Sequence, residues 1–145
     1  MKRYFALLVI TASWFSGLGY AGEPESSRAK CSELGRKFSA DFKKEYVTDF
    51  SLWENPEFHY SPALATCLVY TGIVDGQFQK AVNDIWYYRR ITDIYTNKVL
   101  AYSRYFIGKK DSAKKPVLVN LGNVGDAANL PPEKFAATKT KLFSQ

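Results

Sequence analysis

The chain has 145 residues and a formal net charge of +6 at pH 7, and 16% of its residues are aromatic. This length suits one domain with a modest core, in which aromatic rings bury much apolar area with few side chains. A positive charge this small argues against a nucleic-acid-binding protein, and the sequence shows neither internal repeats nor low-complexity tracts.

The chain begins with the features of a secretory signal peptide. A basic head of three residues precedes an apolar segment over residues 4–15, and the small residues Gly19 and Ala21 suit cleavage after Ala21. A retained membrane anchor is the alternative, but this segment is shorter than the roughly 20 residues that a spanning helix needs, and no later segment is long and apolar enough. We expect residues 1–21 to be a cleaved signal peptide and residues 22–145 to form one periplasmic or secreted domain. That domain would carry +4, because the leader holds two basic residues and no acid.

Two cysteines, Cys31 and Cys67, are present in the sequence. In an oxidising exported compartment such a pair most simply forms one disulfide. A loop of about 36 residues closed in this way stabilises a domain by about 3–4 kcal/mol. Two cysteines and a single histidine are too few for a standard structural zinc site, so we expect neither a metal nor another cofactor.

A helix is predicted from Ser26 or Ser27, as N-cap, to about Tyr46. Apolar side chains recur there at spacings of three and four residues, which places them on one helical face that we expect to pack against the core. These positions are Cys31, Leu34, Phe38, Phe42 and Tyr46.

Residues 47–62 are predicted to be an irregular connection, because Pro56 and Pro62 interrupt regular structure. Residues 64–74 then alternate as a strand that is apolar on both faces, as expected of a strand covered by a helix.

A β-hairpin is predicted from residues 83–95 and 99–107, with a tight polar turn at residues 96–98. A helix over part of residues 78–87 remains an open alternative, because the periodicity there is ambiguous. After Gly108, residues 109–116 form a charged loop whose lysines are either solvated or bound to an anionic envelope surface.

Residues 117–121 are predicted to add a short fourth strand, and Pro131-Pro132 opens a short helix that carries Phe135. The tail 109–145 either packs on the core or reaches elsewhere. The predicted fold class is therefore α+β, with an N-terminal helix packed on a three- or four-stranded antiparallel sheet and joined to it by Cys31–Cys67.

Two segments carry a resemblance to a known group of proteins. Residues 57–69 read EFHYSPALATCLV, with His-Tyr, Leu and Cys at fixed steps, and residues 91–102 read ITDIYTNKVLAY. Both are similar to blocks in small exported bacterial proteins that have no assigned activity. The resemblance implies export and a helix-plus-hairpin layout, and it transfers no catalytic residue. The chain departs from the pattern at Ser61-Pro62 and lacks the additional tail cysteines of that group.

His59, the only histidine, is the candidate general base for a hydrolase. Ser61 and Asp93 are the other members of a Ser-His-Asp set, but the sequence provides neither a nucleophile elbow nor an oxyanion arrangement. We expect His59 to anchor its loop on the sheet instead. Asp93 is expected to pair with an arginine or with the turn backbone at Asn97.

The segment WYYRR, residues 86–90, interleaves aromatic rings with arginines, a combination that stacks on sugars, lipid headgroups or protein side chains. The predicted ligand-binding residues are Trp86, Tyr88, Arg89 and Arg90. In a strand, alternation allows only about half of the cluster 86–90 to be exposed together.

These features predict a non-enzymatic binding module for a protein, glycan or lipid of the cell envelope. The alternatives are an inhibitor of a secreted hydrolase and a small envelope hydrolase that uses His59.

Overall fold

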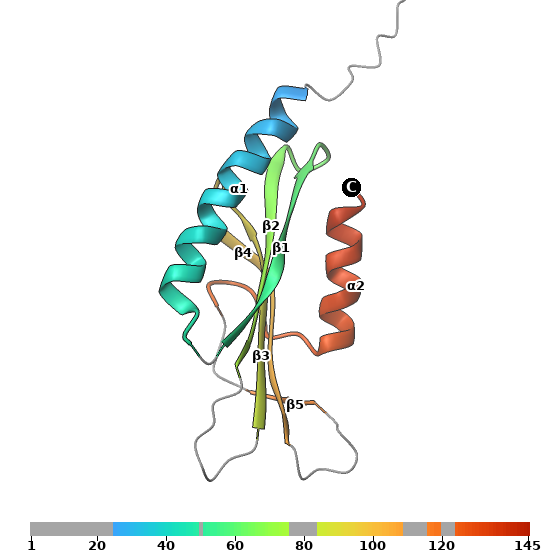
Figure 1. The fold of residues 1–145 in the computed structure, drawn as a ribbon. Helices are drawn as coiled ribbons and strands as arrows, with labels where there is room; N and C mark the ends of the chain where they lie inside the picture. Colours follow the sequence, from blue (N-terminus) through green and yellow to red (C-terminus); the bar gives the residue numbers. More distant parts are fainter. Residues whose placement is uncertain (1–24, 50, 76–83, 109–115, 120–123) are drawn as a thin grey trace, which may run out of the picture.

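The computed structural model describes residues 25–49, 51–75, 84–108, 116–119 and 124–145, so the predicted signal peptide lies outside the described residues. Five strands form one antiparallel sheet in the order β1-β2-β3-β4-β5, and one helix lies at each end of the chain (Figure 1). The predicted α+β class is confirmed. The elements are α1 (Glu25–Tyr46), β1 (Ser51–Ser61), β2 (Thr66–Asp75), β3 (Asp84–Asp93), β4 (Lys98–Gly108), β5 (Val117–Leu118) and α2 (Pro132–Phe143).

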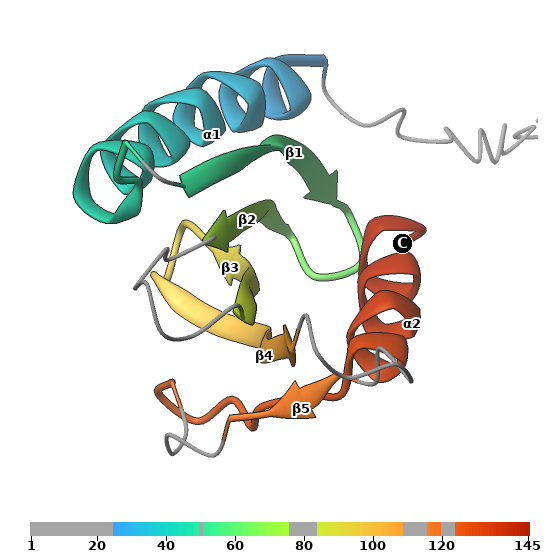
Figure 2. The same cartoon turned by 60° about the horizontal axis from the view of Figure 1, so that its bottom comes forward.

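The two helices cover opposite faces of the sheet (Figures 1 and 2). Helix α1 packs on β1 and β2, whereas α2 packs on β4 and β1. Side chains alternate along each strand, so β3 directs Tyr88 and Arg90 to the α1 face and Arg89 and Ile91 to the α2 face. Neither helix is long and apolar enough to cross a membrane; this finding concerns the described residues.

Helix α1 packs closely because small residues lie on its inner face. Cys31 and Phe42 of the predicted apolar stripe are buried, together with Gly35 and Ser39. A Cβ atom at Gly35 would lie 2.7 Å from the Cγ atom of Phe58, so glycine lets the helix backbone approach β1. The last turn of α1 contains Lys43 and Lys44, whose positive charges interact favourably with the C-terminal end of the helix dipole.

The predicted disulfide is confirmed: Cys31 of α1 is bonded to Cys67 of β2, with 5.3 Å between the two Cα atoms. Both residues are buried, at 1% and 0% exposure. The bond therefore fixes α1 to the sheet near the start of the helix.

The prediction of an irregular connection over residues 47–62 was wrong, because Ser51–Ser61 form strand β1. Its pairing with β2 is interrupted between Glu54 and Glu57, and Pro56 lies in that bulge. Strand β1 is at the edge of the sheet, where a missing N–H donor costs no hydrogen bond to a second neighbour. Pro62 follows the last strand residue.

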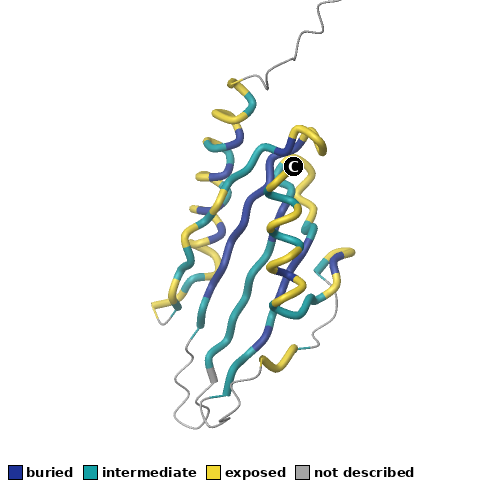
Figure 3. Tube along the Cα trace, turned by 90° about the vertical axis from the view of Figure 1, so that its right-hand side faces the viewer, coloured by how far each residue is buried: buried dark blue, intermediate teal, exposed yellow. Residues whose placement is uncertain are grey.

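Strand β2 is the most buried element, since residues from Thr66 to Ile73 are all buried (Figure 3). It lies between β1 and β3, beneath α1 on one face, and its register with β3 runs from Leu68–Asp93 to Asp75–Trp86. The core on the α2 face comprises Leu68, Tyr70, Ile91, Ala101 and Phe135.

The predicted hairpin is confirmed as β3 and β4. Residues 84–87 belong to β3, so the alternative helix is excluded there, and residues 78–83 lie outside the described part. Asn97 at the turn has a φ of 55°, a left-handed conformation that asparagine tolerates well.

The described parts of the tail pack on the sheet. Asn129 donates side-chain hydrogen bonds to the carbonyls of Arg104 and Val119 and accepts one from the N–H of Arg104. Phe135 of α2 is 3% exposed and faces Tyr70. Residues 109–115, with the four predicted surface lysines, lie outside the described residues.

Candidate functional site

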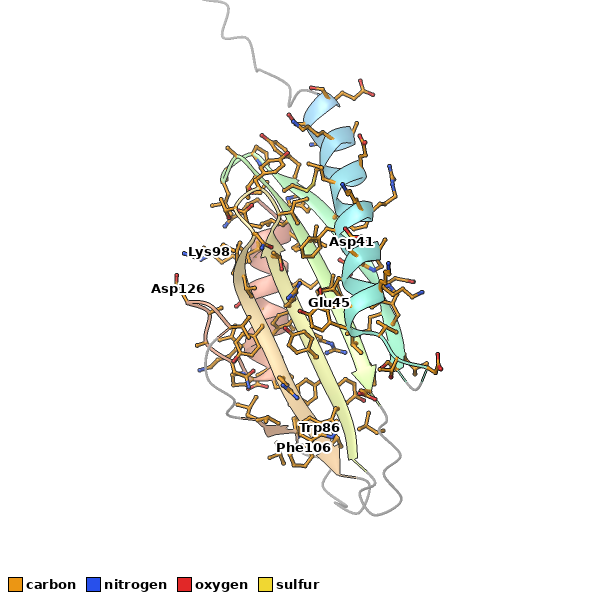
Figure 4. The ribbon with its side chains drawn as sticks, turned by 90° about the vertical axis from the view of Figure 1, so that its left-hand side faces the viewer. Asp41, Glu45, Trp86, Lys98, Phe106 and Asp126 are labelled. Atoms are coloured by element: carbon orange, nitrogen blue, oxygen red, sulfur yellow. A yellow bond between two sulfur atoms is a disulfide. The ribbon has the colours of Figure 1, made fainter. Side chains whose placement is uncertain are left out.

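A groove of about 640 Å³ lies on the α1 face. One wall is α1, the floor is formed by β3 and β4, and the other wall comprises residues 96–98 and 124–126 (Figure 4). It exists because α1 lies over β1 and β2 and leaves the α1 face of the next two strands partly uncovered. Its volume is in the range of small-molecule sites, about 300–1,000 Å³.

Arg90 of β3 lies at the floor of this groove. Its guanidinium carbon is 4.1 Å from the centroid of the Phe42 ring, 5.5 Å from that of Phe38 and 5.8 Å from that of Tyr46. The Nε atom is buried without a hydrogen-bond partner, and no acidic side chain in the described ranges forms an ion pair with Arg90. Three aromatic faces therefore support the cation while its N–H donors stay available.

Two buried threonine hydroxyls accompany Arg90. Thr92 lines the groove at 1% exposure, and Thr71 is 0% exposed and pairs with Arg90 across the two strands. Neither Oγ1 atom has a hydrogen-bond partner. A buried hydroxyl without a partner costs about 1–3 kcal/mol, and of these two the Thr92 hydroxyl belongs to a residue that lines the groove, where a ligand or a water would supply a partner.

The mouth of the groove is acidic. Asp41 and Glu45 are exposed and project from α1 on one side, as Figure 4 shows. On the opposite side the Nζ atom of Lys98 lies 3.5 Å from a carboxylate oxygen of Asp126, whose side chain is 87% exposed. The groove thus has one unpaired cation at its floor and three carboxylates at its rim.

The predicted ligand-binding residues lie on two different faces. Arg90 forms the groove floor, and Tyr88 shares its face and stacks on Phe42. Trp86 also lies on the α1 face, with its ring centroid 5.1 Å from that of Phe106, but away from the groove (Figure 4). Arg89 lies on the opposite face, so three of the four predicted residues share the α1 face.

Arg89 takes part in a separate network on the α2 face. Its Nη2 and Nε atoms donate to the carboxylate of Glu54, with 2.6 Å between Nη2 and Oε1. The hydroxyl of Tyr70 also donates to Glu54, and Nη1 of Arg89 donates to the Tyr105 hydroxyl over 3.3 Å. A Cβ atom at Gly72 would lie 2.9 Å from the carboxyl carbon of Glu54, so glycine makes room for this ion pair.

The network changes the acidity of its members. Burial alone would raise the pKa of the Glu54 carboxyl, but the hydrogen bonds from Arg89 and Tyr70 outweigh burial and hold the pKa below its usual value of 4.5. Burial and the hydrogen bond to Glu54 raise the pKa of the Tyr70 hydroxyl, which therefore stays a donor at neutral pH.

Replacing Glu54 is expected to weaken the acid dependence of stability. Since the pKa of Glu54 is lower in the folded than in the unfolded protein, its contribution is complete above the unfolded value and is lost as the pH falls through the folded value. The free energy of unfolding of Glu54→Gln should therefore fall less steeply than that of the wild type between about pH 5 and pH 2. Urea titrations over this range measure it, and parallel pH curves would contradict the role of Glu54.

The residues of the hydrolase hypothesis have other partners. Asp93 accepts hydrogen bonds from Thr66 and from the backbone and hydroxyl of Thr96, so it caps the turn and pairs neither with an arginine nor with Asn97. Ser61 accepts a hydrogen bond from the N–H of Leu64. The expectation that His59 anchors a loop on the sheet by hydrogen bonds was wrong, because His59 lies within β1 and its Nε2 atom is buried without a hydrogen-bond partner among the described residues. Its ring stacks on Phe143 of α2, with 5.5 Å between the centroids.

Several groove residues were not identified from the sequence as functional. Phe38, Phe42 and Tyr46 were assigned to a packing stripe, and the acids Asp41 and Glu45 had no assigned role. The available signal was the polar pair Arg90 and Thr92 at alternate positions of a strand rich in aromatic and apolar residues. Among the described residues no group of three His, Cys, Asp or Glu side chains forms a metal site.

Comparison with known proteins gives no match: no family model, curated protein or solved structure is significantly similar to this chain. The resemblance to small exported bacterial proteins therefore stays a prediction.

Proposed function

We propose that the protein is an exported, non-enzymatic binding module that holds its ligand in the groove beneath α1. The observation that carries this proposal is Arg90, whose charge and N–H donors have no acceptor in the described part of the chain, although Nε is buried. An arginine held over three aromatic rings is stabilised by cation–π contacts, which leave its N–H donors unused. It gives a ligand a preformed charged contact.

Binding is favoured over hydrolysis by the contacts of the candidate catalytic side chains. Ser61 and Asp93 are occupied by turn hydrogen bonds, and His59 is packed against α2. The groove has donors at its floor, from Arg90 and Thr92, that have no partner among the described residues.

Export is supported by the signal-peptide features and by the disulfide, which is stable in an oxidising compartment. The intact mass of protein from an exporting host tests this part. A chain that starts at Gly22 and is alkylated at both cysteines only after reduction is expected. A full-length chain with two free thiols would refute export.

A fragment screen by NMR on isotopically labelled protein tests the binding site. We expect hits to shift amide resonances of α1 and of residues 90–99 together, because both line the groove. If the hits instead shift only resonances around Trp86 and Phe106, the binding site lies at these two aromatic residues and not in the groove. No hit in the groove would refute the proposal.

A further inference from the structure

The groove also indicates what kind of ligand it takes. We propose that it binds a small zwitterion with an apolar body, such as a short peptide, with the carboxylate at Arg90 and the ammonium at the acidic rim. This inference rests on the proposed function and adds the chemical class of the ligand.

The floor fits a single carboxylate. Arg90 presents a planar fork of N–H donors, which matches the two oxygens of a carboxylate. The Thr92 hydroxyl is nine-tenths buried or more, lines the same groove and has no partner, so it is a further donor for the bound anion. These two residues lie two positions apart in β3 and therefore point to the same face.

The rim fits a cation. Asp41 and Glu45 on α1 and Asp126 on the opposite wall place three carboxylates around the mouth, and only Asp126 has a described cationic partner. They repel an anion with two charges and attract an ammonium group outside the floor contact. A ligand that carries its negative charge inward and its positive charge outward satisfies both ends.

The space between floor and rim fits a short apolar body. Phe38, Phe42 and Tyr46 form one wall, and Val99 and Val124 lie opposite. An extended tripeptide spans about 10 Å. A volume of about 640 Å³ accommodates a ligand of that size.

A matched series of three peptides tests the two charges separately on the wild-type protein from an exporting host. The probes are Ala-Ala-Phe, the same peptide with a C-terminal amide, and the same peptide with an acetylated N-terminus. We expect the amide to bind at least about tenfold more weakly, because it loses the charge-assisted contact with Arg90. The acetylated peptide should bind about two- to fivefold more weakly, an effect that disappears at high salt because the rim is exposed.

Variants assign these differences to residues. In Arg90→Lys the preference for acid over amide should shrink, since lysine keeps the charge and loses the fork. In Glu45→Gln the preference for a free N-terminus should shrink, whereas Glu33→Gln, an exposed acid of α1 outside the groove, should leave it unchanged.

The outcomes separate this inference from the proposed function. Equal binding of the acid and the amide, or of the free and the acetylated peptide, would overturn the zwitterion proposal. Fragments that shift groove resonances while none of the three peptides binds would also overturn it and leave the binding function standing. If neither the fragments nor the peptides shift the groove resonances, both the zwitterion inference and the proposed binding function are refuted.

Discussion

Reduction of the Cys31–Cys67 disulfide is expected to lower the free energy of unfolding by about 3–4 kcal/mol. The bond closes a loop with a sequence separation of 36 and restricts the unfolded chain. It also joins α1 to the sheet, so the loss should loosen the helix that forms one wall of the groove. Urea unfolding with and without reductant measures the difference, because a domain of this size is expected to unfold in one cooperative step.

The double variant Cys31→Ala with Cys67→Ala is the control for this experiment. Its stability should not respond to reductant, and it should resemble the reduced wild type apart from the cost of two small cavities. A wild type that is equally stable in both redox states would contradict a stabilising role of the bond.

Phe42→Ala is expected to lower the free energy of unfolding by about 3–5 kcal/mol, the cost of truncating a buried aromatic ring. Phe42 is 3% exposed, and its ring centroid lies 5.7 Å from that of Trp53 and 4.6 Å from that of Tyr46. It is also the ring closest to the Arg90 guanidinium. Its loss therefore removes core packing and uncovers a charge at the groove floor.

Tyr46→Ala is the matched control, because Tyr46 lies one turn further along α1 on the same stripe and is 47% exposed. It should cost no more than about 1 kcal/mol, even though its ring also faces Arg90. Equal losses for the two variants would show that burial does not distinguish these positions.

The elements with strong local signals were predictable from the sequence. The spacing of apolar residues predicted α1, and alternation with a polar turn predicted β3 and β4. The cysteine count predicted the disulfide. These signals are local or compositional, and one chain is enough to detect them.

Strand β1 was not predictable in the same way. A proline is unfavourable in the middle of a sheet, and Pro56 is tolerated because β1 lies at the edge. Edge position is a property of the whole sheet, which the segment itself does not encode.

The candidate site was only partly predictable for a similar reason. Alternation separated Arg89 from Arg90, but the partners that distinguish them come from distant segments. Arg89 meets Glu54 across 35 positions of sequence, whereas Arg90, among the residues that the structure describes, meets the aromatic rings of α1. Which of two adjacent arginines is paired and which is available follows from tertiary packing.

Titration of the best groove fragment into Arg90→Gln and Arg104→Gln tests whether Arg90 contacts the ligand. Arg104 is a matched control, since it is also half-buried on the α1 face and lies over an aromatic ring, that of Trp86, but does not line the groove. We predict at least about tenfold weaker binding for Arg90→Gln and wild-type affinity for Arg104→Gln. Unchanged affinity in folded Arg90→Gln would contradict the claim.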